Sequence, residues 1–363
     1  MPELPEVETI ARDLRGLVIG ARIVGARSDW PRTLRSHDPE AFARALVGRE
    51  IVGVGRRGKQ LLVWLGPAGD ADGDGASPDP AVLTVHLKMT GQLFVVEAGT
   101  PQDRHVHVVL AFADGRELRF RDMRKFGRMG LYRRDLATGL PVEGEAAGVL
   151  ARGAEPLAGD FTARRFAETL ARRRGRLKTL LMNQDFLAGV GNIYADEALW
   201  RARLHPLRDA HTLGAQDARR LHKALRDVLA EAVERRGSSV DDYTAPQGDG
   251  SMQEHLAVYQ RAGEPCERCG RPIKRIVVGG RSTHFCSWCQ RLPAEQRAAA
   301  GKLLRSTGDV GQPRATRRGT RWTELSGEGV LGRATDEEAR ARRIAANRQA
   351  ASTRRAAARG GVT

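Results

Sequence analysis

The stretch CERCGRPIKRIVVGGRSTHFCSWC, residues 266–289, holds all four cysteines of the 363-residue chain. They form two Cys-x2-Cys pairs, Cys266/Cys269 and Cys286/Cys289, and 16 residues lie between the pairs. That intervening segment resembles two short strands around Gly279-Gly280, so a hairpin would bring the pairs together. The spacing predicts a closed four-cysteine structural zinc site with one ion and no open position for catalysis. The alternative is a redox dithiol pair.

The chain is strongly basic, with 60 Lys and Arg against 44 Asp and Glu and a net charge of +16. Such an excess favours an anionic partner, either nucleic acid or an anionic membrane. The sequence has no run of the roughly 18 apolar residues that a membrane span needs. The acidic opening MPELPEVE is also unlike a secretory signal. We therefore expect a soluble cytoplasmic protein with no membrane partner.

The hydrophobic pattern changes twice before the cysteines. Residues 5–18 place apolar side chains on one helical face, and residues 160–236 return to helical periodicity. Between them, residues 21–132 consist of short β-rich runs separated by turn sequences, which predicts an antiparallel sandwich or barrel. The stretch GPAGDADGDGASPDP (66–80) has no periodicity and is expected to be a loop.

We therefore expect an α+β multidomain chain in four parts. Residues 1–134 form a leading helix and an antiparallel β-sandwich, residues 135–256 a helical domain, and residues 257–291 the zinc finger. Residues 292–363 contain 14 Arg and one Lys against seven acidic residues, with few large apolar groups. Because this composition does not support a core, we expect a disordered basic tail.

Pro2 is a candidate nucleophile because a Met followed by a small residue is normally trimmed, which would leave a free secondary amine. An α-amino group has a pKa near 8, against about 10.4 for lysine, so more of it is unprotonated at neutral pH. Attack of a secondary amine on a sugar carbon gives a cationic iminium that favours elimination. The adjacent Glu3 has the chemistry of an acid or base. Without other support, this dipeptide is more often a flexible end or a helix cap.

Seven separated motifs together resemble the formamidopyrimidine-DNA glycosylase family, over residues 2 to about 291. The motifs are PELPEVET (2–9), RRGKQLL (56–62), HLKMTGQL (86–93), RDMRKFG (121–127), GVGNIYADEALW (189–200), VYQRAGEPC (258–266) and the cysteine hairpin. The resemblance implies a β-sandwich, a helix–two-turn–helix domain and a zinc hairpin, with double-stranded damaged DNA bound between them. It also implies a bifunctional glycosylase and AP lyase of base excision repair, which excises 8-oxoguanine and formamidopyrimidines and cuts the strand by β,δ-elimination.

The motif matches assign catalytic roles to four residues. Pro2 corresponds to the Schiff-base nucleophile and Glu3 to the proton donor for base loss. Lys59 corresponds to the proton donor in β-elimination, and Arg281 to the hairpin arginine tied to δ-elimination and phosphate binding.

The resemblance also assigns DNA contacts. A base inside a duplex must be flipped out before excision, and side chains must fill the gap that it leaves. The matched wedge residues are Met89, Arg124 and Phe126, although Met89 and Phe126 alone would be assigned to a core. Further matched contacts, to phosphates or nearby DNA, are His105, Arg173, Lys178 and Asn192. Phosphate contacts predict binding that weakens steeply with salt.

Three features depart from the family's pattern: Lys88 in HLKM, Lys125 in RKFG, and the long acidic loop 66–80. None includes Pro2, Glu3 or Lys59. Two alternatives remain open, an endonuclease VIII-like enzyme for oxidised pyrimidines and a noncatalytic zinc-containing DNA-binding protein. PELPEV and the long loop 237–254 favour the purine enzyme. We expect a monomer associated with the nucleoid through DNA.

Overall fold

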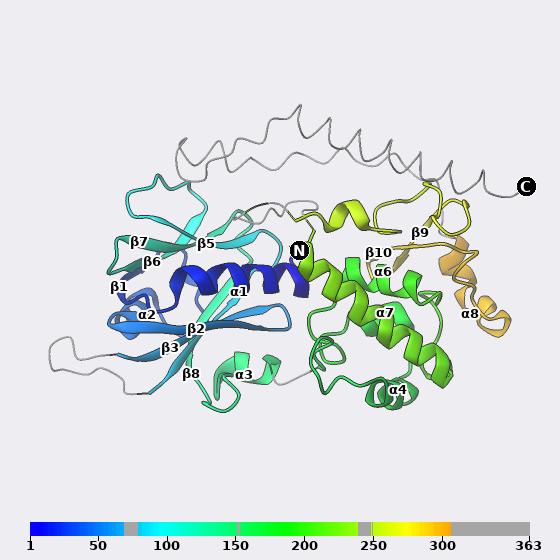
Figure 1. Ribbon diagram of the computed structural model, residues 1–363, viewed down its shortest axis with the longest axis horizontal. Coiled ribbons are helices and arrows are strands. Elements are labelled where there is room, and N and C mark those ends of the chain that lie inside the picture. The colour runs from blue at the N-terminus through cyan, green and yellow to red at the C-terminus, as the bar shows by residue number, and fades with distance from the viewer. Residues whose placement is uncertain (69–78, 151–152, 239–247, 249, 306–363) are drawn as a thin grey trace, which may run out of the picture. The chain divides into compact units, whose positions relative to one another are not determined.

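The computed structural model describes residues 1–68, 79–150, 153–238, 248 and 250–305 (Figure 1). Eight antiparallel strands in residues 23–133 form two four-stranded sheets, ordered β1-β6-β7-β5 and β2-β3-β4-β8. The strands are β1 (Ile23–Ser28), β2 (Arg49–Arg57), β3 (Gln60–Ala68), β4 (Ala81–His86), β5 (Gly91–Glu97), β6 (Val106–Phe112), β7 (Arg116–Asp122) and β8 (Arg128–Arg133). Helix α2 (Pro39–Leu46) connects β1 to β2, and helix α3 (Gly144–Leu150) follows β8.

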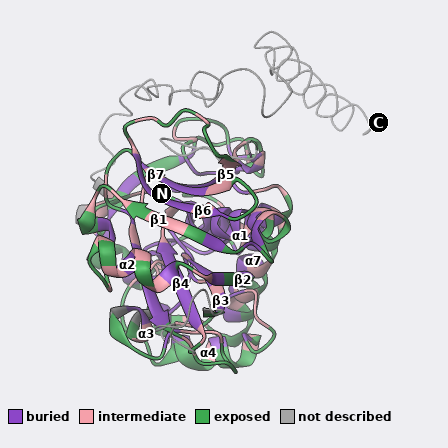
Figure 2. Ribbon diagram, turned by 90° about the vertical axis from the view of Figure 1, so that its left-hand side faces the viewer, coloured by how far each residue is buried: buried purple, intermediate pink, exposed green. Residues whose placement is uncertain are grey.

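The alternation of side chains along the strands explains the sandwich. In β3, Leu61, Val63 and Leu65 lie in the core shared by the two sheets, whereas Leu62 packs on the outer face with Tyr132. Side chains of a strand point to opposite faces in turn, so one apolar set fills the space between the sheets. In Figure 2, buried stretches, drawn in purple, run along strands of the sandwich. The predicted β-sandwich is confirmed.

Helix α1 (Leu4–Val18) contributes side chains to two hydrophobic cores, that of the sandwich and that of the helical region. Its stripe of Val7, Ile10 and Leu14 is fully buried in the sandwich core. Leu4, at the first turn, is instead part of the core of the helical region. The amino-terminal end of α1 therefore lies where the two cores meet, and Figure 1 shows it beside α7.

The helical region consists of α4 (Ala163–Ala171), α5 (Leu177–Leu181), α6 (Asn192–Arg201) and α7 (Ala215–Glu234). The face predicted for α7, including Leu221, Leu225 and Val228, is fully buried against the other helices. Short 3-10 turns occur at Pro31–Thr33, Ala210–Thr212 and Met252–His255. None of the helices within the described residues is long and apolar enough to cross a membrane.

The hairpin predicted between the cysteine pairs is formed by β9 (Lys274–Val278) and β10 (Arg281–Phe285). Helix α8 (Ala294–Arg305) follows it and differs from the expectation for the tail. Leu292 and Ala300 are buried against Ile276 and Phe285, and the Gln296 side chain accepts a hydrogen bond from the backbone N–H of Asp209. The tail predicted as disordered over residues 292–363 is therefore corrected for residues 292–305, where apolar side chains pack on the hairpin. Residues 306–363, most of the loop 66–80 and most of the loop 237–254 lie outside the described residues.

Candidate active site and zinc centre

The carboxylate of Glu3 lies at the amino-terminal end of α6, far away in the sequence. It accepts hydrogen bonds from the backbone N–H groups of Gly191 (2.8 Å), Ile193 (3.0 Å) and Tyr194 (3.4 Å). Free N–H groups and the helix dipole make this end of a helix a good place for a carboxylate. Glu3 is nevertheless 2% exposed, and burial raises the pKa of its carboxyl, opposed by the Lys59 ammonium. The Glu3 carboxyl therefore stays protonated up to a higher pH than an exposed glutamate does.

Glu6 supports Glu3 from the next turn of α1. Its carboxylate accepts hydrogen bonds from the backbone N–H of Glu3 (2.8 Å), the Tyr194 hydroxyl (2.5 Å) and the Ser238 backbone N–H (2.8 Å). The capping-box pattern of Glu3 and Glu6 fixes the start of α1. Glu6 therefore ties the candidate acid to both α6 and the residues after α7.

Lys59 lies in the turn between β2 and β3, and it is 8% exposed. Burial lowers the pKa of its ammonium, and the Arg281 and Lys88 charges lower it further, while the Glu3 and Glu6 carboxylates oppose the shift. Lys59 therefore lies near enough to both Glu3 and Arg281 for their charges to act on its pKa. Arg281 itself is exposed at the start of β10.

Pro2 is buried immediately before Glu3, at the same end of α1. Its nitrogen is bonded to Met1, which is 41% exposed. Removal of Met1 would therefore leave a free secondary amine at Pro2, the residue directly before Glu3.

Gly191 permits the close approach of Glu3 to α6. A Cβ atom at this position would lie 2.3 Å from the Glu3 carboxyl carbon. Gly191→Ala is expected to destabilise the protein by about 2–3 kcal/mol, because the buried carboxylate must leave its backbone donors. Chemical denaturation measures the loss. Gly148→Ala is the control, since nothing lies within 4 Å of a Cβ there; equal effects of the two substitutions would contradict the prediction.

The start of α6 also contacts the hairpin. The side-chain amide of Asn192 donates to the Ser282 carbonyl (2.9 Å), and its Oδ1 is buried without a hydrogen-bond partner. Lys178 is fully buried behind it, bonded to the Asn192 carbonyl (2.8 Å) and paired with Asp196 (2.7 Å). Asn192 and Lys178 lie together, and the Lys178 ammonium is bonded inside the protein because Asp196 lies one turn into α6.

The three wedge candidates lie on two neighbouring loops. Met89 is half-buried in the turn between β4 and β5, and Phe126, in the turn after β7, is 46% exposed with the Arg124 guanidinium 5.0 Å from its ring centre. Asp122 accepts a hydrogen bond from Thr90, which follows Met89, and another from the Gly127 backbone. A buried carboxylate thus joins the two loops.

Two further predicted contacts are His105 and Arg173. His105, partly exposed, precedes β6, and its carbonyl accepts from the backbone N–H of Asp122. Arg173 is exposed between α4 and α5. Lys125, one of the departures, holds its ammonium 3.9 Å from the ring centre of Trp30.

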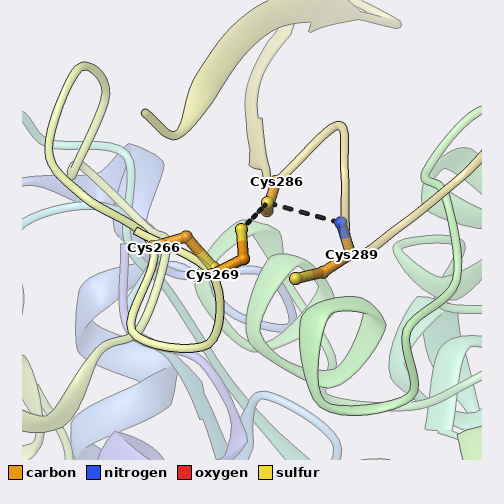
Figure 3. Close-up of side chains that lie close together, drawn as sticks. All are labelled: Cys266, Cys269, Cys286 and Cys289. Carbon is orange, nitrogen blue, oxygen red and sulfur yellow. Dashed lines mark hydrogen bonds between the residues drawn. The ribbon is translucent and has the colours of Figure 1, made fainter. Parts of the chain in front are cut away.

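The four cysteines form the predicted cluster (Figure 3). Their Sγ atoms all lie within 4.8 Å of one another. Tetrahedral zinc with Zn–S bonds of about 2.3 Å needs sulfurs about 3.8 Å apart, so the donor set fits the ion. Cys266, Cys269, Cys286 and Cys289 hold one structural zinc ion, which joins the segment before β9 to the segment after β10.

Two structural carboxylates, neighbours in the motif GVGNIYADEALW (189–200), were not singled out from the sequence. Asp196 pairs with Lys178 and accepts from the His284 backbone N–H (2.8 Å). Glu197 accepts from the backbone N–H groups of residues 257–259, each at 2.9 Å. The signal available was a pair of acidic residues in an otherwise apolar helix.

Comparisons with known proteins agree with this arrangement. Three family models match, namely the formamidopyrimidine-DNA glycosylase N-terminal domain (residues 1–129), its H2TH domain (152–244) and the zinc finger found in FPG and IleRS (263–292). The formamidopyrimidine-DNA glycosylase of Herpetosiphon aurantiacus is 48% identical over 292 residues, 80% of this chain and all of the relative. That of Chloroflexus aurantiacus is 47% identical over 80% of this chain and 98% of the relative.

Solved structures show the same relationship. A mutant of the Lactococcus lactis FPG, in complex with Fapy-dG containing DNA, has a TM-score of 0.70 and 34% identity over 80% of this chain and all of its own. MutM (FPG) from Thermus thermophilus has a TM-score of 0.67 and 42% identity over 80% of this chain and 98% of its own. The chain therefore belongs to the formamidopyrimidine-DNA glycosylase family, whose members are DNA glycosylases of base excision repair.

Proposed function

We propose that the protein excises oxidised purines from double-stranded DNA and then cleaves the strand, with the Pro2 amine as nucleophile. The observation that carries this proposal is the buried Glu3 carboxyl at the amino-terminal end of α6, with Pro2 directly before it in the chain and the buried Lys59 ammonium near enough to act on its pKa. A buried acid beside a buried lysine fits a reaction that needs both proton donation and iminium chemistry. Relatives crystallised with Fapy-dG DNA and with abasic-site DNA support the same substrates.

The proposed steps follow from these groups. The Pro2 nitrogen lone pair bonds to C1′ of the damaged nucleotide, the bond from C1′ to the base breaks, and the base leaves with a proton from Glu3. The proton on the Pro2 nitrogen moves to O4′ as the C1′–O4′ bond breaks and the C1′–N bond becomes an iminium. The iminium then accepts the electron pair of the C2′–H bond as the C2′ proton passes to water. The 3′ phosphate then departs with Lys59 as proton donor, and loss of the 5′ phosphate follows at Arg281. Water finally releases the sugar fragment from Pro2.

The DNA contacts extend the proposal across the site. Arg281, Asn192 and Arg173 bind phosphates, while Met89, Arg124 and Phe126 fill the gap left by the flipped nucleotide. Phe126 is suited to this role because a large apolar side chain that is 46% exposed has no place in the core. Lys178 contributes by holding Asn192 from behind. The protein acts as a monomer at the nucleoid.

A lesion comparison tests the substrate. The mature full-length chain is incubated with a duplex containing 8-oxoguanine opposite cytosine and, separately, with a thymine glycol duplex, and borohydride traps any covalent intermediate. We expect a trapped adduct and faster single-turnover excision on the purine lesion. Preference for thymine glycol would favour the pyrimidine enzyme, and no adduct on either duplex would favour a noncatalytic DNA-binding protein.

The lowered pKa of Lys59 leads to a separate prediction about how strand scission depends on pH. Strand scission needs the Lys59 ammonium. Because the pKa of Lys59 is lowered, scission should decline as the pH rises, and the decline should begin at a lower pH than the pKa of an ordinary lysine would give. The Lys88 charge contributes to that lowering, so Lys88→Gln should raise the pKa of Lys59 and move the alkaline limb to higher pH. Single-turnover scission of an abasic duplex between about pH 7 and 10 measures the limb. A limb that stays in place or moves to lower pH contradicts the assignment.

A further inference from the structure

The turn that carries Lys59 is held by residues from outside the sandwich. Glu155, which lies before α4, is 15% exposed in its side chain. One carboxylate oxygen accepts from Arg56 (2.7 Å), and the other accepts from Arg57 (2.8 Å) and from the backbone N–H of Gly58. A single carboxylate therefore binds three consecutive residues that end directly before Lys59.

A second layer of contacts fixes Glu155 and the same turn. Ala154 exchanges backbone hydrogen bonds with the strand-like segment at residues 186–188. Gly58, with a φ of +58°, packs on that segment, since a Cβ there would lie 3.4 Å from the Ala188 Cβ. The next residue, Gly189, accepts a hydrogen bond from the Leu4 backbone N–H (3.0 Å). One short region thus holds both the Lys59 turn and the start of α1.

The charge network reaches α1 as well. Arg56, whose side chain is 8% exposed, lies between Glu155 and Glu8, with its Nε 2.9 Å from the Glu8 carboxylate. Charge-assisted hydrogen bonds with little solvent access are stronger and more directional than exposed pairs. Because Lys59 has to be placed to a fraction of an ångström for proton transfer, the rigidity of its turn matters for rate.

We propose that Glu155 is a positioning residue for Lys59, so that contact between the helical region and the β2–β3 turn sets the rate of strand scission. This inference rests on the proposed role of Lys59. Glu155 does not touch the reacting atoms. It acts by holding the backbone from which the Lys59 side chain extends.

The test is a double-mutant cycle in the full-length chain. Glu155→Gln keeps the size of the side chain but places an amide donor among three donors. Strand scission of a duplex with a preformed abasic site should fall about tenfold or more, while the rate of borohydride trapping changes less than about threefold. Combined with Lys59→Met, Glu155→Gln should cause no further loss. The alkaline limb of scission should also move to higher pH, because a looser Lys59 is better solvated.

Glu231→Gln is the matched control. Glu231 also bridges two arginines, Arg201 (2.6 Å) and Arg235 (3.0 Å), but within the helical region. Glu231→Gln should leave the rate of scission unchanged, while it lowers the thermal stability about as much as Glu155→Gln does. If Glu155→Gln does not fold, Arg57→Gln removes one of the three donors and should show the same selective loss to a smaller degree.

Three outcomes would overturn the positioning role: scission within twofold of wild type, equal losses of trapping and scission, or multiplying losses in the double variant. Failure of the proposed function looks different. In that case wild type forms no trapped adduct, or Lys59→Met cleaves abasic DNA as fast as wild type.

Discussion

A chain whose Pro2 nitrogen stays acylated is expected to form no borohydride-trapped adduct and to lose strand scission by about a thousandfold or more. In an amide, the nitrogen lone pair is delocalised into the carbonyl group, so it cannot attack the sugar carbon. The full chain carrying an uncleaved amino-terminal tag provides this blocked form. Trapping on an 8-oxoguanine duplex and single-turnover scission of an abasic duplex measure the two losses.

The control is the same protein after the tag has been removed so that the chain begins at Pro2. It should regain both activities, which separates the chemistry from any effect of the preparation. Pro2→Gly with a free amino terminus keeps a primary amine but loses the rigid ring, and an intermediate rate is expected. Adduct formation by the tagged protein at the rate of the untagged one would place the nucleophile elsewhere.

Cys286→Ser is expected to release the zinc ion and to weaken binding of a lesion duplex by about a hundredfold or more. Structural zinc in small fingers contributes about 10–16 kcal/mol of apparent binding free energy, which here holds the ends of the β9–β10 hairpin together. The hairpin presents Arg281 and accepts the Asn192 hydrogen bond at Ser282. Without the ion, Arg281 and Asn192, which we propose bind phosphates, lose their support.

Metal content and the dissociation constant for the duplex measure these effects. Ser287→Ala is the matched control, since Ser287 is exposed in the same turn between Cys286 and Cys289. It should retain one zinc ion and normal affinity. Full affinity of a zinc-free Cys286→Ser protein would mean that the hairpin is held by its packing on α8 and α6 instead.

Local sequence patterns predicted the separate elements well. The two Cys-x2-Cys pairs and the glycines between them predicted the hairpin and its metal ligands, and the apolar stripe from Val7 to Leu14 predicted α1. These features depend on side-chain period and short spacing, which can be read without knowing the rest of the chain. The resemblance then assigned roles to Glu3, Lys59 and Arg281, and in the structure the charges of Glu3 and Arg281 both act on the buried Lys59.

What the sequence by itself determined was therefore the strands of the sandwich, the helices α1 and α7, the zinc ligands and the chemical groups available for catalysis. Only the tertiary structure decided which of these groups are buried. Glu3 binds backbone groups that begin 188 residues away, Lys178 is enclosed with Asp196, and residues 292–305 pack on the hairpin. Desolvation and hydrogen bonding between distant segments depend on which surfaces meet, and no local pattern records that. The contact of the Glu155 carboxylate with the Lys59 turn could not be predicted for the same reason, because it joins segments almost 100 residues apart.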